Sequence, residues 1–250
     1  MRTSNISDLA TLDHKPAATS TWEPVAHLQF TQMLFDKLRG AGFQMGTPNI
    51  ELTHGRMPKR ALSNAGEEIK WANMFGIAEI QHWDVQNPEG LHTLLGWRNS
   101  HCQRVAMGIG VGSRVVVCSN MSFEADRKLN QIHHIGAFAQ IQNDLQDLLA
   151  SRWIQDRMRI RNLRVHEYKE QTMSDTDFRQ FTEKVIVDKG ILSPSKYSKM
   201  VDLWKNYKPN DFERNTKWRA FNVVTELLKG STLPVIAAKT QKLHEVTMCA

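Results

Sequence analysis

One short segment of the chain gathers side chains whose types could do chemistry. It reads Arg98-Asn99-Ser100-His101, and Arg104 follows it closely. These side chains offer several hydrogen-bond donors and one group that titrates near neutral pH, which suits recognition of a phosphate, a carboxylate or a base edge. A buried polar corner, in which Arg98 and Asn99 bind backbone carbonyls of neighbouring loops, explains the same residues equally well. The sequence leaves both interpretations open.

Histidine and cysteine side chains near this segment could assemble a metal site. The candidate ligands are His101, Cys102, Cys118, His133 and His134. All are of types that zinc accepts, but their spacing matches no recurring zinc module. Adjacent residues such as His133 and His134 also diverge by about 100° on a helix. We therefore expect neither a metal ion nor another cofactor.

A nucleophile is the other chemistry that the segment offers. Cys102 lies between Arg98 and Arg104 in the sequence, and nearby positive charge favours the thiolate form. A histidine such as His101 could act as its base. No recognised esterase, zinc-protease or kinase motif accompanies these residues, however. We expect no catalytic residue, and a His/Cys or metal-dependent hydrolase is kept only as an alternative.

The glycines that follow the segment do not predict a nucleotide site. Gly108, Gly110 and Gly112 lack the Lys-Ser/Thr of a phosphate loop, and they precede an expected strand rather than a helix. We expect them to form a small turn or to allow close backbone approach beside a sheet. Arg114 and Asn120, which lie close to that expected strand, join the candidate interface.

A second basic group lies on one expected helix. Arg157, Arg161 and Arg164 follow i, i+4, i+7 spacing and therefore share a helix face. Such a face could neutralise several phosphates and extend a track that starts at Arg98. Intramolecular pairing with nearby acids such as Asp156 is the alternative, to which we give equal weight.

The charge of the chain is unevenly distributed along the sequence. The net charge is +6, and residues 151–230 hold 17 of the 32 basic residues but only 11 of the 26 acidic ones. This stretch therefore accounts for the whole positive excess. A basic segment on a neutral body is typical of a surface that binds nucleic acid or another polyanion. Lysine-rich solvated helix faces are the alternative.

The elements that would position these residues follow from apolar periodicity. Val25, Leu28, Leu34 and Leu38 recur at helical spacing, and Gly40 ends the pattern. Short runs of β-forming residues come next, at about 43–45, 50–53, 69–80, 92–97 and 114–118. A helical period then returns, first in one long helix over about 135–158 and then in helices that begin near Ser174, Ser193, Asn215 and Pro234.

These elements predict an α+β fold with an N-terminal helix, a sheet of about five mostly antiparallel strands and a helical C-terminal half. Residues 1–21 lack apolar periodicity, so we expect a flexible arm there. Residues 22–250 are expected to form a single α+β domain that is sheet-rich over 43–120 and helical over 123–246.

Several of these segments resemble the domain-of-unknown-function family 932, a group of phage and plasmid-like proteins. The specific similarities are Arg98-Asn99-Ser100-His101 and the element Val117-Cys118 followed by Asn120. The helix that contains His27-Leu28 and the segment from Phe221 to Lys229 are weaker similarities, and the resemblance runs from about residue 24 to 246. The setting of the family implies work on mobile-element DNA, or on the host systems that attack such DNA.

The chain departs from the family pattern at its acidic positions. Members usually continue Arg-Asn-Ser-His with an Asp and a Lys-Ser pair, and they carry an Asp between the Cys and the Asn of the second element. Cys102, Gln103-Arg104 and Ser119 occupy these places here. Because both carboxylates are lost, the resemblance favours recognition or structural roles over catalysis.

We therefore expect a non-enzymatic nucleic-acid-binding protein of phage or plasmid type that assists DNA replication, recombination or strand annealing. Single-stranded DNA is one expected partner, and an unpaired edge strand would allow a homo-oligomer. A protein-interaction or counter-defence module, whose basic surface meets an acidic host protein, is the main alternative.

The compartment follows from what the sequence lacks. No window approaches the ~18 consecutive apolar residues of a membrane span, and the first residues contain no apolar signal core. The three cysteines form no CxxC pair, which fits a reducing compartment. We expect no membrane partner and a cytoplasmic protein, in the host cytoplasm if a phage encodes it.

Overall fold

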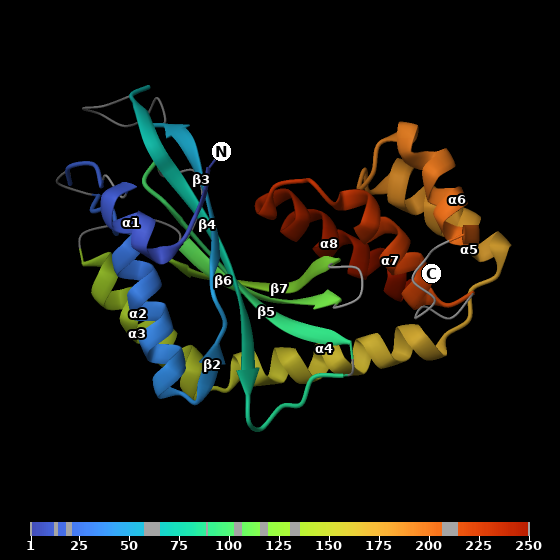
Figure 1. The fold of residues 1–250 in the computed structure, drawn as a ribbon, viewed down its shortest axis with the longest axis horizontal. Coiled ribbons are helices and arrows are strands. Elements are labelled where there is room, and N and C mark those ends of the chain that lie inside the picture. Colours follow the sequence, from blue (N-terminus) through green and yellow to red (C-terminus); the bar gives the residue numbers. More distant parts are fainter. Residues whose placement is uncertain are drawn as a thin grey trace. The chain divides into compact units, whose positions relative to one another are not determined.

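Strands dominate the first half of the chain and helices the second (Figure 1). The computed structural model describes residues 2–12, 15–18, 22–57, 66–88, 90–102, 107–115, 120–130, 136–206 and 215–249. The strands are β1 (Arg2–Ser4), β2 (Phe43–Met45), β3 (Asn49–Arg56), β4 (Glu68–His82), β5 (Leu91–Ser100), β6 (Met107–Val115) and β7 (Met121–Asn130). The α+β class is confirmed.

The helices begin before the sheet and continue after it. They are α1 (Ile6–Leu12), α2 (His27–Gly40), α3 (Ala137–Ala150), α4 (Trp153–Glu170), α5 (Asp175–Glu183), the π-helical turn η1 (Lys184–Asp188), the 3₁₀ turn η2 (Pro194–Lys196), α6 (Tyr197–Asn206), α7 (Lys217–Leu228) and α8 (Leu233–Met248). The expected N-terminal helix corresponds to α2, and the helical C-terminal half is also confirmed.

The described strands form one sheet in the order β1-β3-β4-β5-β6-β7, and β2 pairs with β4 beside this path. The pairs β1–β3, β2–β4 and β3–β4 are antiparallel. Ile50 lies opposite Gly76 and Leu52 opposite Met74, and the register shifts between Thr53 and Gly55. The sheet therefore has seven described strands where the sequence predicts about five.

Strand β4 packs closely against its neighbours because Gly76 has no side chain. A Cβ atom placed on Gly76 would lie 2.1 Å from the ring of Trp97, so the indole occupies that space. The indole Nε1 donates to Thr31 Oγ1 on α2 at 3.2 Å, and the ring meets Phe35 edge-on at 5.3 Å. These contacts fix α2 against the sheet.

The structure differs from the sequence prediction at the start of the chain. Residues 1–21 are expected to form a flexible arm, but Arg2–Ser4 pairs with β3 and Ile6–Leu12 is helical. Leu9 is fully buried. The seven residues of α1 make only about two helical turns, too few for apolar periodicity to mark the helix.

The middle of the chain differs in two further ways. The glycine-rich stretch is part of β6 rather than a turn, whereas the close backbone approach that was the other expectation is present: a Cβ on Gly112 would lie 2.2 Å from the carbonyl oxygen of Ser122. The segment after residue 123 is strand β7 rather than helix. The expected helix over 135–158 is divided into α3 and α4 at Ser151 and Arg152, and Arg152 has a φ of 55°.

The chain divides into two compact units, where the sequence predicts one domain over 22–250. Unit 1 comprises Met1–Gln86, Leu94–Val111 and Asp126–Asp156, and unit 2 comprises Asn87–Thr93, Gly112–Ala125 and Arg157–Ala250. Strands β5, β6 and β7 each contribute residues to both units. Unit 2 contains α5 to α8 and most of α4, and its core includes the aromatic rings of Tyr168, Phe178, Trp204, Trp218 and Phe221.

Candidate functional site

Asn99, at the centre of the predicted cluster, is buried in unit 1. Its Nδ2 donates to the carbonyl oxygen of Val25 at 2.8 Å and lies 3.0 Å from Nδ1 of His27. Its Oδ1 accepts from the backbone N–H of Ser100 at 2.8 Å. The amide therefore joins the end of β5 to the chain segment that begins α2.

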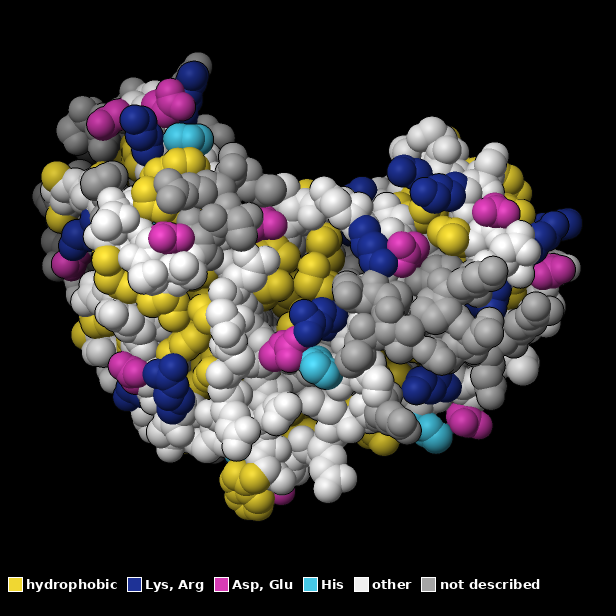
Figure 2. All heavy atoms as spheres, viewed as in Figure 1, with side chains coloured by type: hydrophobic (Ala, Val, Ile, Leu, Met, Phe, Trp, Pro, Cys, Tyr) yellow, Lys and Arg dark blue, Asp and Glu magenta, His cyan; other side chains and the backbone are white. Residues whose placement is uncertain are grey.

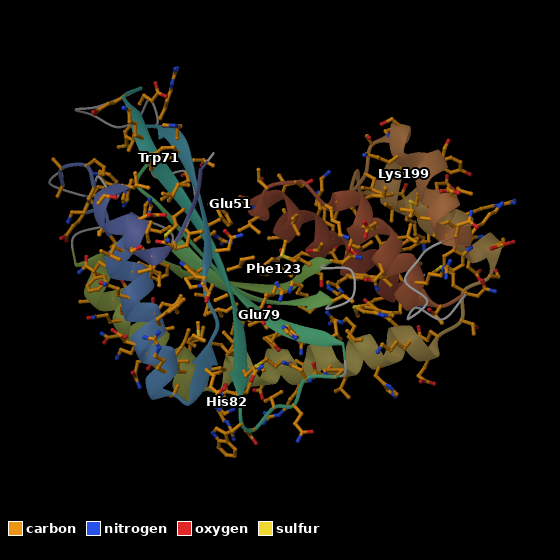
Figure 3. The ribbon with its side chains drawn as sticks, in the orientation of Figure 1. Glu51, Trp71, Glu79, His82, Phe123 and Lys199 are labelled. Atoms are coloured by element: carbon orange, nitrogen blue, oxygen red, sulfur yellow. The ribbon has the colours of Figure 1, made fainter. Side chains whose placement is uncertain are left out.

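His101 and His27 extend this junction. Their rings stack at 3.8 Å with an angle of 4° between the planes. His101 Nε2 lies 2.9 Å from the carbonyl oxygen of Val25, and His27 Nε2 lies 2.9 Å from that of Trp71, which Figure 3 labels on β4. Because a carbonyl oxygen only accepts, both Nε2 atoms carry a hydrogen.

Cys102 belongs to the same buried corner. Its thiol donates to Oδ1 of Asn73 at 3.3 Å, and the hydroxyl of Ser100 donates to the same oxygen at 2.8 Å. Cys102 and His101 are both fully buried. In this arrangement the thiol and the imidazole are enclosed by protein groups, so they serve the fold and are not open to a substrate. The buried-corner interpretation therefore holds for Asn99, and Arg98 is half-buried beside it.

One of the three arginines predicted to share a helix face is buried. Arg161 is fully buried in unit 2, where it donates to Oγ1 of Thr93 at 2.9 Å, to the carbonyl oxygen of Gly112 at 3.3 Å and to Oδ1 of Asn87 at 2.8 Å. Arg157 and Arg164 are half-buried. This helix face is thus not one solvent-facing track, which corrects that part of the sequence prediction.

The remaining predicted residues have different surroundings. Asn120 is buried and donates to the carbonyl oxygen of Asn222 at 3.2 Å. Arg114 is half-buried on β6. Arg104, Cys118, His133 and His134 lie outside the described residues. The structure therefore joins Asn99, Ser100 and His101 within unit 1, whereas Arg114, Asn120 and the three arginines of α4 belong to unit 2.

A different surface of unit 2 combines exposed cations with exposed apolar groups. The residues are Arg179 on α5, Val187 on η1, Lys196 on η2, and Tyr197 and Lys199 on α6. Tyr197 is 49% exposed and Val187 is 71% exposed, and the three cationic side chains are exposed too. Figure 2 shows dark blue and yellow side chains next to one another over α5 and α6, and Figure 3 labels Lys199 on α6.

Three of these side chains, Arg179, Val187 and Tyr197, line a shallow groove, which we call the Tyr197 groove. Its volume is about 480 Å³, and its lining includes Arg179, Glu183, Val187, Pro194 and Tyr197. The four-residue spacing puts Arg179 and Glu183 on the same face of α5. Cationic, anionic, aromatic and aliphatic groups thus meet within one small depression.

Local sequence signals position the walls of the groove. Ser174 caps α5: its hydroxyl accepts from the backbone N–H of Asp177 at 3.1 Å, and Asp177 accepts from the backbone N–H of Ser174 at 3.0 Å. Hydrogen bonds from the side chain and backbone of Ser174 lower the pKa of Asp177 below its ordinary value. Pro194, which fits the first turn of a helix, begins η2 after Ser193.

Contacts outside the groove lining hold α5 and α6 together. The rings of Phe178 and Trp204 stack at 4.3 Å, and Trp204 Nε1 donates to Oδ1 of Asp175 at 2.8 Å. Arg219 Nε on α7 donates to the carbonyl oxygen of Trp204 at 2.8 Å. The helices α5 and α6, which contribute Arg179 and Tyr197 to the groove, are therefore connected to each other and to α7.

The model of the family described as Domain of unknown function (DUF932) matches residues 62–247, which is well over half of the chain. The chain belongs to this family. The resemblance seen in the sequence is therefore confirmed at the level of the family. No curated protein and no solved structure matches the chain. The DUF932 match includes Asn99 and the Tyr197 groove, whereas Val25 and His27, which complete the buried corner, precede it.

The sequence gives no indication that one histidine, His244, is buried. His244 on α8 is buried against Phe221, with ring centroids 4.6 Å apart, and its Nδ1 lies 3.4 Å from the hydroxyl of Tyr168. Burial, aided by the charge of Arg164, lowers the pKa of His244 to about 3. The imidazole is therefore neutral at physiological pH. A lone histidine in a helix carries no sequence signal of such burial.

The described residues include no cluster suited to a metal ion. No group of three or more histidine, cysteine or acidic side chains in this part of the chain could hold one. Likewise, none of the described helices has both the length and the apolar character needed to cross a membrane. The exposed helices of unit 2 offer hydrogen-bonding, charged and aromatic side chains for recognition.

Proposed function

We propose that this protein binds nucleic acid through its helical unit 2. The observation that carries the proposal is the division of charge between the two compact units. Unit 2 contains 19 basic and 13 acidic residues, whereas unit 1 contains 13 of each. The whole net charge of +6 therefore belongs to one unit. A positively charged body attracts the phosphate backbone, which supplies much of the affinity of nucleic-acid-binding proteins.

The exposed side chains of unit 2 are the proposed contacts. Arg179 lines the Tyr197 groove, Lys196 and Lys199 are exposed on η2 and α6, and Arg157 and Arg164 add positive charge to the same unit from half-buried positions. The buried residues Asn99, Ser100, His101, Asn120 and Arg161 are given structural roles instead. The proposed activity is non-enzymatic, cytoplasmic binding of phage- or plasmid-derived DNA during replication, recombination or annealing.

Fluorescence anisotropy with labelled single-stranded oligonucleotides tests the proposal. The full chain is titrated at several salt concentrations, with a control for nuclease activity. We expect affinity to fall steeply as salt rises, because each phosphate contact releases counterions. Absence of binding at about 50 mM salt, in the range where such contacts are strong, would overturn the proposal.

A double substitution, Lys196→Gln with Lys199→Gln, tests where the nucleic acid binds. We expect weaker binding and a shallower salt slope, with a reduction of about 0.7 for each phosphate of a single strand that is no longer neutralised. Lys15→Gln with Lys70→Gln is the matched control, since it removes the same charge from exposed sites in unit 1. Equal effects of the two double variants would show that total charge, rather than unit 2, governs binding.

A protein-binding module remains the second candidate, and one observation favours it. Leu163 on α4 is 63% exposed, and Ile160, one turn earlier, is also exposed. Exposed apolar side chains on a helix face are suited to contact with another protein. Two results together would favour this candidate over nucleic-acid binding. The protein would not bind oligonucleotides but would form a complex with another protein, and the Leu163→Ser variant would not form that complex.

A further inference from the structure

Tyr197 is unusual among the aromatic residues of unit 2. The other described aromatic side chains of α4 to α7 are enclosed in the core or half-buried, whereas Tyr197 is half exposed and borders a groove. Pro194, at the start of η2, lies in the same lining. A tyrosine ring beside a proline offers flat apolar surface to solvent, and such surface suits stacking with a planar ligand.

A π-helical turn contributes to the lining of the same groove. Residues Lys184–Asp188 continue α5 with wider turns, and the backbone N–H of Lys189 donates to the carbonyl oxygen of Lys184 at 3.0 Å. This turn presents Val187 to solvent and to the groove. Single π-helical turns are rare and occur often at functional sites. The groove therefore contains aliphatic as well as aromatic surface.

The charges of the groove are arranged for a nucleotide. Arg179 in the lining, together with the exposed Lys196 and Lys199, which lie one and two residues from Tyr197 in the sequence, provides positive charge to attract phosphate groups. Glu183 lines the groove, where its carboxylate would repel phosphate but can accept hydrogen bonds from the exocyclic amino group of a base. A nucleotide whose base enters the groove and whose phosphates stay at the rim satisfies both kinds of charge.

We infer that the Tyr197 groove receives one unpaired base, preferably one with an exocyclic amino group, from a single-stranded nucleic acid. The inference rests on the proposed nucleic-acid binding and adds the form of the partner and the subsite. In a duplex the bases are stacked and paired, so no base face is free to lie against Tyr197. Single strands expose their bases for stacking on aromatic side chains.

The stacking contact is tested by comparing Tyr197→Ala with Tyr197→Phe in the full chain. We expect Tyr197→Ala to weaken binding of a single-stranded oligonucleotide by at least about fivefold, since stacking against one aromatic residue has that magnitude or more. Tyr197→Phe should retain affinity within about twofold, because the ring remains. Trp83→Ala is the matched control, because Trp83 is an 81% exposed aromatic residue of unit 1.

The hydrogen bond is tested separately with Glu183→Gln. We expect the unmodified protein to bind an oligomer of dC more tightly than an oligomer of dT, because thymine has no exocyclic amino group. Glu183→Gln should reduce this preference, since an amide can donate to thymine O4 as well as accept from cytosine. Glu183 and Tyr197 are both exposed, so their substitution should not disturb the core. Thermal melting checks that each variant is folded.

The two proposals fail in different ways. If no oligonucleotide binds, nucleic-acid binding itself is wrong. If binding is sensitive to salt but equal for single strands and duplexes, and Tyr197→Ala and Glu183→Gln leave affinity and base preference unchanged, only the groove inference is overturned. A reduced affinity of Tyr197→Ala that appears equally with duplex would also overturn it.

Discussion

Asn99 joins two parts of unit 1 through a single buried amide. It donates to the carbonyl oxygen of Val25 and accepts from the backbone N–H of Ser100. We expect Asn99→Ala to lower the free energy of unfolding by about 1–3 kcal/mol, the usual cost of removing a buried hydrogen-bonding group. Urea denaturation measures it, and Asn206→Ala is the control because Asn206 is an exposed asparagine bonded to Asp202.

The same variant separates a structural role from a binding role. If Asn99 supports the fold only, Asn99→Ala should keep its oligonucleotide affinity under conditions where it remains folded. If Asn99→Ala instead leaves stability unchanged but reduces oligonucleotide affinity, Asn99 belongs to the nucleic-acid interface that the sequence predicts.

The sequence predicts which residues share a helix face, but it does not predict which of them are buried. The sequence identifies Arg157, Arg161 and Arg164 as one face, yet helical spacing does not say which face points inward. A signal was present: Arg161 falls in line with the buried residues Met158 and Val165, at i−3 and i+4. The exposure of Tyr197 gave no signal, because its spacing from Met200 and Trp204 is that of a core position.

At the scale of elements, the close packing of β4 against the ring of Trp97 makes a prediction about Gly76. We expect Gly76→Ala to destabilise the protein by about 1–3 kcal/mol, as overpacking of a filled core does, because the new Cβ would lie 2.1 Å from the indole. Gly40→Ala is the control, since a Cβ there meets no atom within 4 Å. Thermal melting of both variants checks the prediction, and equal melting temperatures would contradict it.

Elements with local signals were the most predictable. The capping box at Ser174, the Ser193-Pro194 start and the apolar repeat of α2 each act within one or two turns of chain, so the sequence places them well. The break between α3 and α4 depends on a partner distant in sequence, and β7, which neighbours β6 in the sheet, also bonds through Phe123 to Thr240, 117 residues away. Arg152, which lies at that break, binds Asp84, which is 68 residues away.

At the scale of the whole molecule, His244 makes the stability of the fold depend on pH. Its pKa is lowered to about 3 in the folded chain and rises to about 6.5 when the chain unfolds. Between these values the unfolded chain binds the additional proton, so stability falls as pH drops below about 6.5 and stops falling through this group near 3. The slope contributed by one proton is about 1.4 kcal/mol per pH unit.

Urea denaturation at pH 7 and pH 5 measures this linkage, and His244→Gln is the comparison variant. We expect the unmodified protein to lose more stability between these pH values than the variant, because glutamine does not titrate. Parallel losses of stability in the two proteins would mean that other groups account for the acid sensitivity.

The division of the chain into units has a consequence for how the protein is made. Unit 1 requires residues as late as Asp156, and unit 2 requires residues as early as Asn87. During synthesis, neither unit can be completed before the chain has passed well beyond the sheet, so early strands must wait for partners translated later. A fragment that begins at Arg157 would also lack Asn87 and Thr93, the partners of the buried Arg161. Cutting the gene at a single point therefore cannot yield either unit intact.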